Sequence, residues 1–253
     1  MTEATVGVVE QPAVAHRSRL RTTVETVLRN RLAVSGLVIL LLLIVVALFA
    51  PAIAPYTINE VDIANRLAGP SAAHWFGTDE LGRDVFSRVV IAARVSLQVG
   101  FIAVGIAVAA GVPAGLVAGY YGRWVDSVLM RVMDILFSIP AIVLAIAILA
   151  ALGPNITNAM VAIGVVYTPI FARITRGSVL SLRESVFVVA ARSLGATDLR
   201  ILRTHILPNV VAPIIVQTSL SLAFAILAEA ALSFLGLGVQ PPAPAWGRML
   251  SEA

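Results

Sequence analysis

The chain has 253 residues, of which 59% are hydrophobic and 13% are charged, and its formal net charge is +4. Soluble domains carry about 25% charged residues, so this composition excludes an ordinary soluble protein and predicts an all-α polytopic membrane protein. There is no cysteine, which excludes disulfides and thiolate metal sites. The small net charge is not that of a nucleic-acid-binding protein, and no nucleic-acid partner is expected.

Continuous apolar runs predict five membrane-spanning helices, because each run comes near the ~20 residues that cross ~30 Å of hydrocarbon. The runs do not alternate between apolar and polar residues, which favours helices over strands. The predicted spans are Leu32–Ile53, Val95–Gly119, Ile135–Leu152, Thr157–Leu180 and Ile206–Ala228. Glycines and prolines between residues 236 and 244 disfavour a further span there, and the odd number of spans predicts a sixth one beyond residue 253.

The arginines predict the orientation in the membrane. Thirteen of the eighteen lie in the N-terminal tail, between spans two and three, or in the stretch that runs from Arg173 and Arg176, at the inner end of span four, to the start of span five. The positive-inside rule therefore puts the N-terminus and these two loops in the cytoplasm. The expected organisation is a tail (1–31), a first span (32–54), an extracytoplasmic loop (55–94) and a transmembrane domain (95–253) with a cytoplasmic loop at 181–205.

The first apolar run has two interpretations, a retained span or a cleaved signal peptide. It follows a basic tail, and Ala52–Ile53–Ala54 loosely resembles a small-residue cleavage site. The run is longer than the 7–15 residues of a signal-peptide core, which favours a retained span. The first ~16 residues show no helical period, and we expect them to be disordered.

No catalytic or metal-binding set is visible in the sequence. His16, His74 and His205 fall in the tail, the outer loop and the inner loop, so they cannot form one metal site. No nucleotide-binding glycine loop is present, so the chain is not expected to bind ATP or to act as an enzyme. The spans hold almost no ionisable residues, which disfavours a secondary carrier driven by protons or ions.

Two residue types inside the predicted spans concern packing and bending. Gly111, Gly115 and Gly119 recur every four residues, which predicts close helix packing within the subunit in preference to a contact between subunits. Prolines inside membrane helices are either tolerated residues or hinges, and the sequence does not decide between the two. These prolines are Pro113, Pro140, Pro169 and Pro213.

The loop at Ser181–Asn209 is patterned more strongly than a simple connection requires. A short helix is predicted over Arg183–Leu194, with Gly195 as its C-terminal cap, and a second helix is predicted from Thr197 or Asp198 to Pro208. Ala190 and Ala191 would leave a shallow patch on which another protein could sit. The alternative is an amphipathic loop on the lipid headgroups. On the outer side, Thr78–Arg88 predicts an amphipathic surface helix, or else a partner contact.

The same loop carries a family resemblance. Ala190–Ala191–x3–Gly195–x9–His205–x–Leu207–Pro208 resembles the EAA motif of ABC importer permeases, and Val189 stands where the general motif has Glu. Three further segments, Phe76–Arg88, Arg131–Pro140 and Leu232–Gly247, are similar to the C-type permease subunits of bacterial dipeptide/oligopeptide/nickel ABC importers. The resemblance implies the type I ABC importer permease fold and a translocation pathway formed with a homologous B-type permease.

The resemblance also implies partners and roles. Two ATP-binding subunits, which hold ATP and Mg, would dock on the cytoplasmic side, a substrate-binding protein would dock outside, and this chain would bind no cofactor. The implied coupling helix comprises Arg183, Glu184, Phe187, Ala190, Ala191 and Gly195. Dipeptides or oligopeptides are the expected cargo, with nickel chelates or haem as alternatives. A channel or carrier that works without ATPases is the competing class.

Overall fold

The computed structural model describes residues 29–253, so most of the expected tail at 1–31 lies outside the described residues. The chain divides into two compact units, 1–43 and 44–253. The described residues form helices without strands: α2 (Arg31–Ile53), η1 (Ile63–Asn65), α3 (Val85–Tyr121), α4 (Arg123–Ser138), α5 (Ala141–Leu152), α6 (Ile156–Leu182), α7 (Val186–Ser193), α8 (Asp198–Ile201), η2 (Leu202–Ile206), α9 (Leu207–Phe234) and α10 (Trp246–Ser251).

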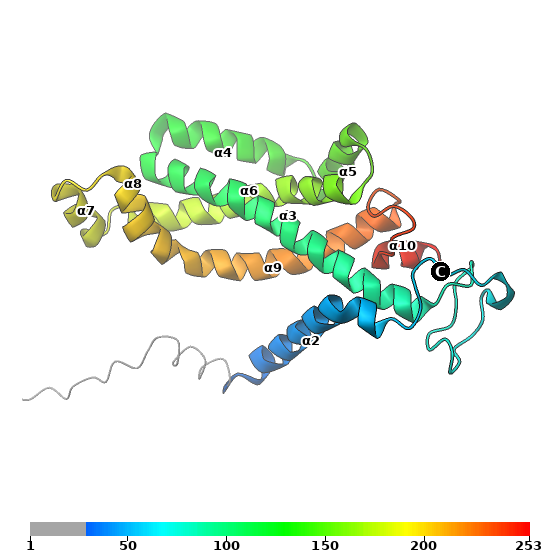
Figure 1. The fold of residues 1–253 in the computed structure, drawn as a ribbon. Coiled ribbons are helices and arrows are strands. Elements are labelled where there is room, and N and C mark those ends of the chain that lie inside the picture. The colour runs from blue at the N-terminus through cyan, green and yellow to red at the C-terminus, as the bar shows by residue number, and fades with distance from the viewer. Residues whose placement is uncertain (1–28) are drawn as a thin grey trace, which may run out of the picture. The chain divides into compact units, whose positions relative to one another are not determined.

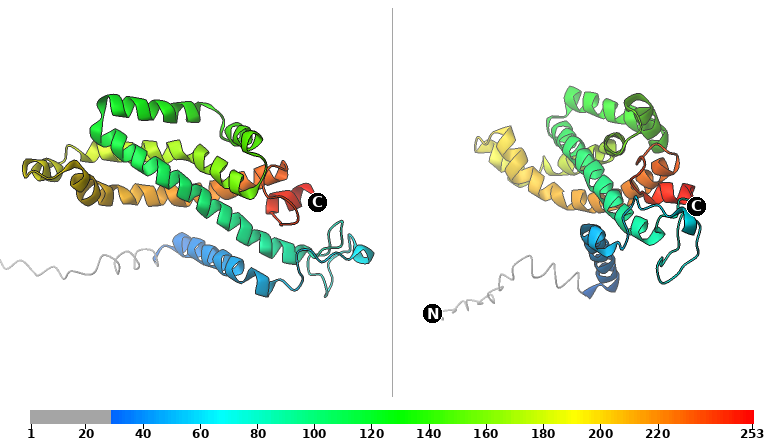
Figure 2. Two further views of the ribbon diagram at one scale, coloured as in Figure 1. Left: turned by 45° about the horizontal axis from the view of Figure 1, so that its top comes forward. Right: turned by 45° about the vertical axis from the view of Figure 1, so that its right-hand side comes forward.

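Four helical segments are long and apolar enough to cross a membrane, and α4 with α5 makes a fifth if this bent pair is one span. The second unit is built around α3, α6 and α9, which lie side by side (Figures 1 and 2). Val99, Ile163, Phe171 and Val210 fill the core between these helices and are fully buried. The α7–α8 segment lies at one end of the bundle, and α10 lies at the other (Figure 1).

The glycines at 111, 115 and 119 lie against α6, so that α3 and α6 approach closely. A Cβ atom added at Gly111 would come within 2.7 Å of Phe171 Cβ, and one at Gly119 within 2.8 Å of Val179 Cβ. The residue numbers of the contacting positions increase together along α3 and α6, so the two helices run in the same direction. Two spans that are separated by one intervening span must be parallel in this way.

The third predicted span is not one straight helix. α4 and α5 meet at 93°, with the break at Ile139–Pro140. Pro140 has no N–H to continue the helical ladder, and the residue before a proline is driven to extended backbone, as Ile139 is, with φ −93° and ψ 132°. By contrast, α3, α6 and α9 continue through Pro113, Pro169 and Pro213.

The predicted surface helix at Thr78–Arg88 is wrong. Thr78 and Asp84 form an isolated β-bridge, and helical structure begins only at Val85, which is the first residue of α3. Asp84 caps it by accepting the backbone N–H of Ser87 at 2.8 Å. Gly82 adopts φ +74°, and a Cβ atom added there would overlap the carbonyl oxygen of Asp62, so no side chain fits. This turn prevents a helix before residue 85.

The predicted stop at Pro208 is also wrong, because the chain stays helical from Asp198 to Phe234. A π-helical turn at Leu202–Ile206 precedes Pro208, and Pro208 occupies the first turn of α9, where its missing N–H costs little. The side chain of Asn209 donates to the carbonyl of His205 at 2.6 Å. This bond gives the carbonyl of His205, in the π-helical turn, a side-chain donor from the first turn of α9.

Candidate coupling site between α6 and α9

Helix α7 is a short helix with a well-formed C-terminal end. It spans Val186–Ser193, and Gly195 follows with φ +79°. The N–H of Ala196 donates to the carbonyl of Ala191 at 3.1 Å, and the N–H of Gly195 donates to that of Arg192 at 3.0 Å. This pair of bonds is a Schellman motif, in which glycine is favoured because it adopts the left-handed conformation without strain. The predicted glycine cap is therefore in place.

The start of the predicted helix is wrong by three residues. Arg183 is the C-cap of α6 and does not belong to α7. Its guanidinium donates to the carbonyl of Gly119 at 3.3 Å and to the carboxylate of Glu184 at 3.3 Å. Arg183 therefore ties the end of α6 to the end of α3. Glu184 is exposed in the short connection between α6 and α7.

The α6–α9 connection is anchored to the bundle from two sides. Val188, Ile201 and Ile206 are fully buried and join the core of the second unit. The Tyr120 hydroxyl at the end of α3 donates to Asp198 at 2.7 Å and accepts from Arg192 at 3.5 Å. Arg192 and Asp198 thus join the connection to α3 through side chains, and α8 continues as helix into α9.

The outward side of the connection exposes large apolar side chains. Val186 and Leu194 are 86% and 89% exposed, and Phe187 is 43% exposed. Between α7 and α8 lies a hollow of about 440 Å³, lined by Phe187, Ala190, Ala191, Gly195, Arg200 and His205 among others. The predicted alanines and Gly195 thus share one concave surface, and their small size leaves it open.

The charge of this surface is positive and stable. The hydrogen bond to the Tyr120 hydroxyl raises the pKa of Arg192 above its ordinary value, and a guanidinium is charged at physiological pH with or without that shift. Apolar exposure together with positive charge suits either of the two predicted roles, a protein partner or the lipid headgroups.

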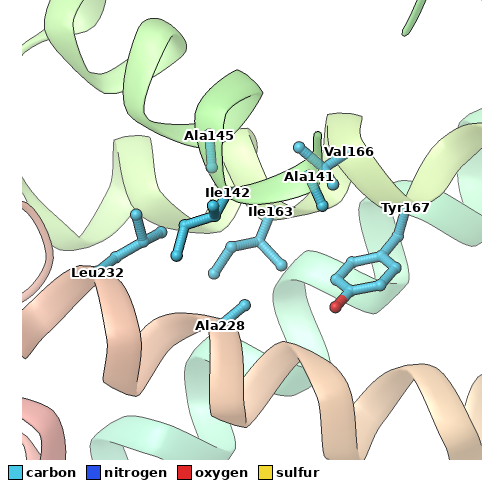
Figure 3. Close-up of a pocket in the computed structure, with 8 residues that line it drawn as sticks. All are labelled: Ala141, Ile142, Ala145, Ile163, Val166, Tyr167, Ala228 and Leu232. Atoms are coloured by element: carbon cyan, nitrogen blue, oxygen red, sulfur yellow. The ribbon is translucent and has the colours of Figure 1, made fainter. Parts of the chain in front are cut away.

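A second feature is a small apolar pocket between α5, α6 and α9 (Figure 3). Its volume is about 100 Å³, and its walls include Ala141, Ile163, Ala228 and Leu232. The hydroxyl of Tyr167 is the polar group at its edge (Figure 3). The pocket lies beside the break at Pro140, because Ala141 and Ile142 of its lining directly follow that proline.

Two contacts between helices distant in the sequence, one at the site and one at the far end of α9, were not found from the sequence. Tyr120 lies 78 positions before its partner Asp198, and no local pattern indicates that contact. Glu229 is fully buried in α9 and accepts from Ser96 of α3 at 3.2 Å and from Ser233 at 2.6 Å. Within residues 29–253, no group of three metal-ligating side chains is close enough to hold an ion.

Comparison with known proteins identifies the family. The family model described as binding-protein-dependent transport system inner membrane component matches residues 111–253. A second, described as the N-terminal membrane domain of oligopeptide transport permease C, matches residues 18–70.

Two curated relatives are similar over most of the chain. The dipeptide transport system permease protein of Alkalihalophilus pseudofirmus is 53% identical over 89% of this chain and 74% of its own length. A glutathione transport system permease protein of Escherichia coli is 49% identical over 89% of this chain and 75% of its own length.

Solved structures support the fold. Two inward-facing crystal forms of the MetNI methionine ABC transporter match with TM-scores of 0.53 and 0.55, at 21% and 20% identity. These matches cover 60% and 65% of this chain and 76% and 79% of those chains. The expected ABC importer permease fold is confirmed. The chain therefore belongs to the C-type inner-membrane permeases of binding-protein-dependent ABC importers, which are pathway subunits and not enzymes.

Proposed function

We propose that this permease carries short peptides, with dipeptides as the first substrate class to test. The observation that supports this cargo is the 53% identity to a dipeptide permease over most of the chain. The glutathione permease at 49% identity agrees with it, because glutathione is itself a short peptide. The family implies ATPase and binding-protein partners, and in our proposal a homologous B-type permease completes the pathway.

In this proposal, α7 receives the movement that ATP hydrolysis causes in the ATPase subunits. Two ATP-binding subunits hold ATP and Mg, and one of them receives α7 together with the hollow at Ala190, Ala191 and Gly195. The exposed Val186 and Leu194 support this role, because large apolar side chains outside a membrane span favour a protein partner. The anchoring through Val188 and Tyr120 transmits movement of the ATPase to α3 and α9.

The proposed orientation places α7 and the N-terminus in the cytoplasm. Arg192, Arg200 and Arg203 lie at the α7–α8 end of the bundle, and the positive-inside rule assigns that end to the cytoplasm. The parallel packing of α3 on α6 supports the alternating order of spans on which this orientation depends.

The test is a substitution that fills the hollow with charge. Ala191→Asp should separate transport from ATP hydrolysis in proteoliposomes that contain the permeases, the ATPases and the binding protein. We expect uptake of radiolabelled dialanine to fall about tenfold, which corresponds to ~1.4 kcal/mol of lost coupling. ATP hydrolysis without the binding protein should continue, because this chain supplies no catalytic residue.

Ser193→Asp is the matched control. It adds the same charge to the same helix, at an exposed position that does not line the hollow. Near-normal uptake is expected for this variant. Normal uptake by Ala191→Asp would contradict the docking assignment, and absence of dialanine uptake by the unmodified complex would contradict the cargo.

A further inference from the structure

Two Arg–Asp ion pairs join α4 to the half of α6 that leads to Leu182. Arg176 holds Asp126 through two hydrogen bonds of 2.5 and 2.6 Å. Arg173 holds Asp134 through one hydrogen bond of 2.8 Å. The sequence suggested that both arginines only mark the inner end of the fourth span, but the structure gives each of them a partner on another helix.

The two pairs lie in different surroundings. In the Arg176–Asp126 pair the carboxylate is 17% exposed and both of its oxygens are used. In the Arg173–Asp134 pair the side chains are 40% and 56% exposed. Among the described residues, Arg173–Asp134 is the only side-chain hydrogen bond that either member makes. The Arg176–Asp126 pair therefore serves to hold α4 against α6. In the Arg173–Asp134 pair, exposed donor and acceptor atoms remain available for a further partner.

Arg173 of the open pair lies inside a helix that is long and apolar enough to cross a membrane. Arg173 is nine residues from Leu182 and seventeen from Ile156, which places it about 14 Å and about 26 Å along α6 from those ends. Charged side chains at such depth are costly when they face lipid, and they turn instead to a partner or to a water-filled space. The Phe137 ring covers one side of the Arg173 guanidinium, at 4.1 Å from the ring centroid.

The pair continues a surface that starts at the apolar pocket. Val166 lines that pocket and precedes Arg173 by seven residues, so the two lie on the same face of α6, about two turns apart. The Pro140 break separates Phe137 from Ala141. Phe137 lies next to the ion pair, and Ala141 lines the pocket. An apolar surface thus leads to an open pair of opposite charges.

We propose that Asp134, Phe137 and Arg173 line the translocation pathway near its cytoplasmic end. The carboxylate and the guanidinium offer opposite charges to the ammonium and carboxylate termini of a short peptide, and Phe137 offers an apolar surface to its side chains. The assignment of a peptide to this surface rests on the proposed function. The exposure of the surface to water does not.

The first experiment measures water access with introduced cysteines, because the chain has none of its own. Phe137→Cys in inverted membrane vesicles that contain the full complex should react with a water-soluble, charged methanethiosulfonate reagent. Ile135→Cys is the control, since Ile135 is 59% exposed and lies about 200° around α4 from Phe137, away from the proposed path, where we expect no reaction. An unreactive Phe137→Cys in every nucleotide state, or equal reaction of both variants, would overturn the proposal.

The second experiment separates a pathway role from a structural one by reversing each pair. The double variant Asp126→Arg/Arg176→Asp should restore the dialanine uptake that either single change lowers, because a tie between helices works in both directions. Asp134→Arg/Arg173→Asp should leave uptake at least about tenfold below the unmodified complex, the effect of ~1.4 kcal/mol. Restored uptake in the second double variant would overturn the pathway role.

A failure of the proposed function gives a different pattern. If the unmodified complex takes up no dialanine, the peptide-recognition part of this proposal is overturned together with the cargo. The cysteine experiment contains no peptide, and its result still decides whether the surface lines an aqueous path.

Discussion

At the scale of single residues, the coupling site depends on positions that cannot be exchanged freely. Gly195 holds a left-handed conformation at the end of α7, and open space surrounds its Cα. A side chain there meets no clash, but it strains the backbone by about 1–2 kcal/mol. Its neighbours Ala190 and Ala191 matter for the opposite reason, since their backbone is ordinary and their small size keeps the hollow open.

Gly195→Ala should loosen α7 and lower the ATP hydrolysis that the loaded binding protein stimulates. Gly195→Asn should lower it less, because asparagine tolerates the left-handed region better than alanine does. The stimulated hydrolysis rate of the reconstituted complex checks this order. Equal rates for glycine, asparagine and alanine would show that the conformation at position 195 has no role in coupling.

The motif residues could be found from the sequence because they lie within one short segment. The contacts that position them could not. Tyr120 and Asp198 come from different helices, and so do Asp134 and Arg173. The sequence placed these residues only in loops or at the inner end of a span. A pairing between helices depends on which helix faces pack together, and the sequence does not show that.

At the scale of helices, hydrophobic runs predicted where four spans lie, and local backbone chemistry decided where they start, bend and continue. Pro140 breaks a helix and Pro208 does not, although both are prolines in apolar surroundings. Pro208 lies in the first turn of α9 after a π-helical turn, whereas Pro140 ends up between two helices. For Pro113, Pro140, Pro169 and Pro213, the two alternatives of hinge and tolerated residue both stay predictions.

Close packing of α3 on α6 gives a prediction with an internal control. Gly115→Ala should destabilise the subunit by about 1–3 kcal/mol, because its Cβ would come within 2.7 Å of Thr175 Cβ. Gly105→Ala in the same helix has no neighbour within 4 Å and should be neutral or slightly stabilising. Thermal unfolding of the purified complex in detergent compares the two variants. Equal melting temperatures would contradict the packing role of Gly115.

At the scale of the whole molecule, the proposed function joins a helical pathway to the docking element that we assign to α7. Composition predicted a polytopic membrane protein, and the family resemblance implied a pathway subunit that depends on partner ATPases for energy. The family assignment agrees with that prediction. The link between docking element and pathway is specific to the folded chain, since Tyr120, Val188 and the continuous helix from Asp198 to Phe234 connect α7 to α3 and α9.

The most direct test of this account is a cross-link between α7 and an ATPase subunit. Ala190→Cys, in a chain that otherwise lacks cysteine, should form an adduct with the ATPase when a short bifunctional reagent is added to the assembled complex. Ala73→Cys is the control, because it is exposed in the 55–84 segment, away from α7. The account predicts an adduct from position 190 and none from position 73. No adduct from position 190 in any nucleotide state would contradict it.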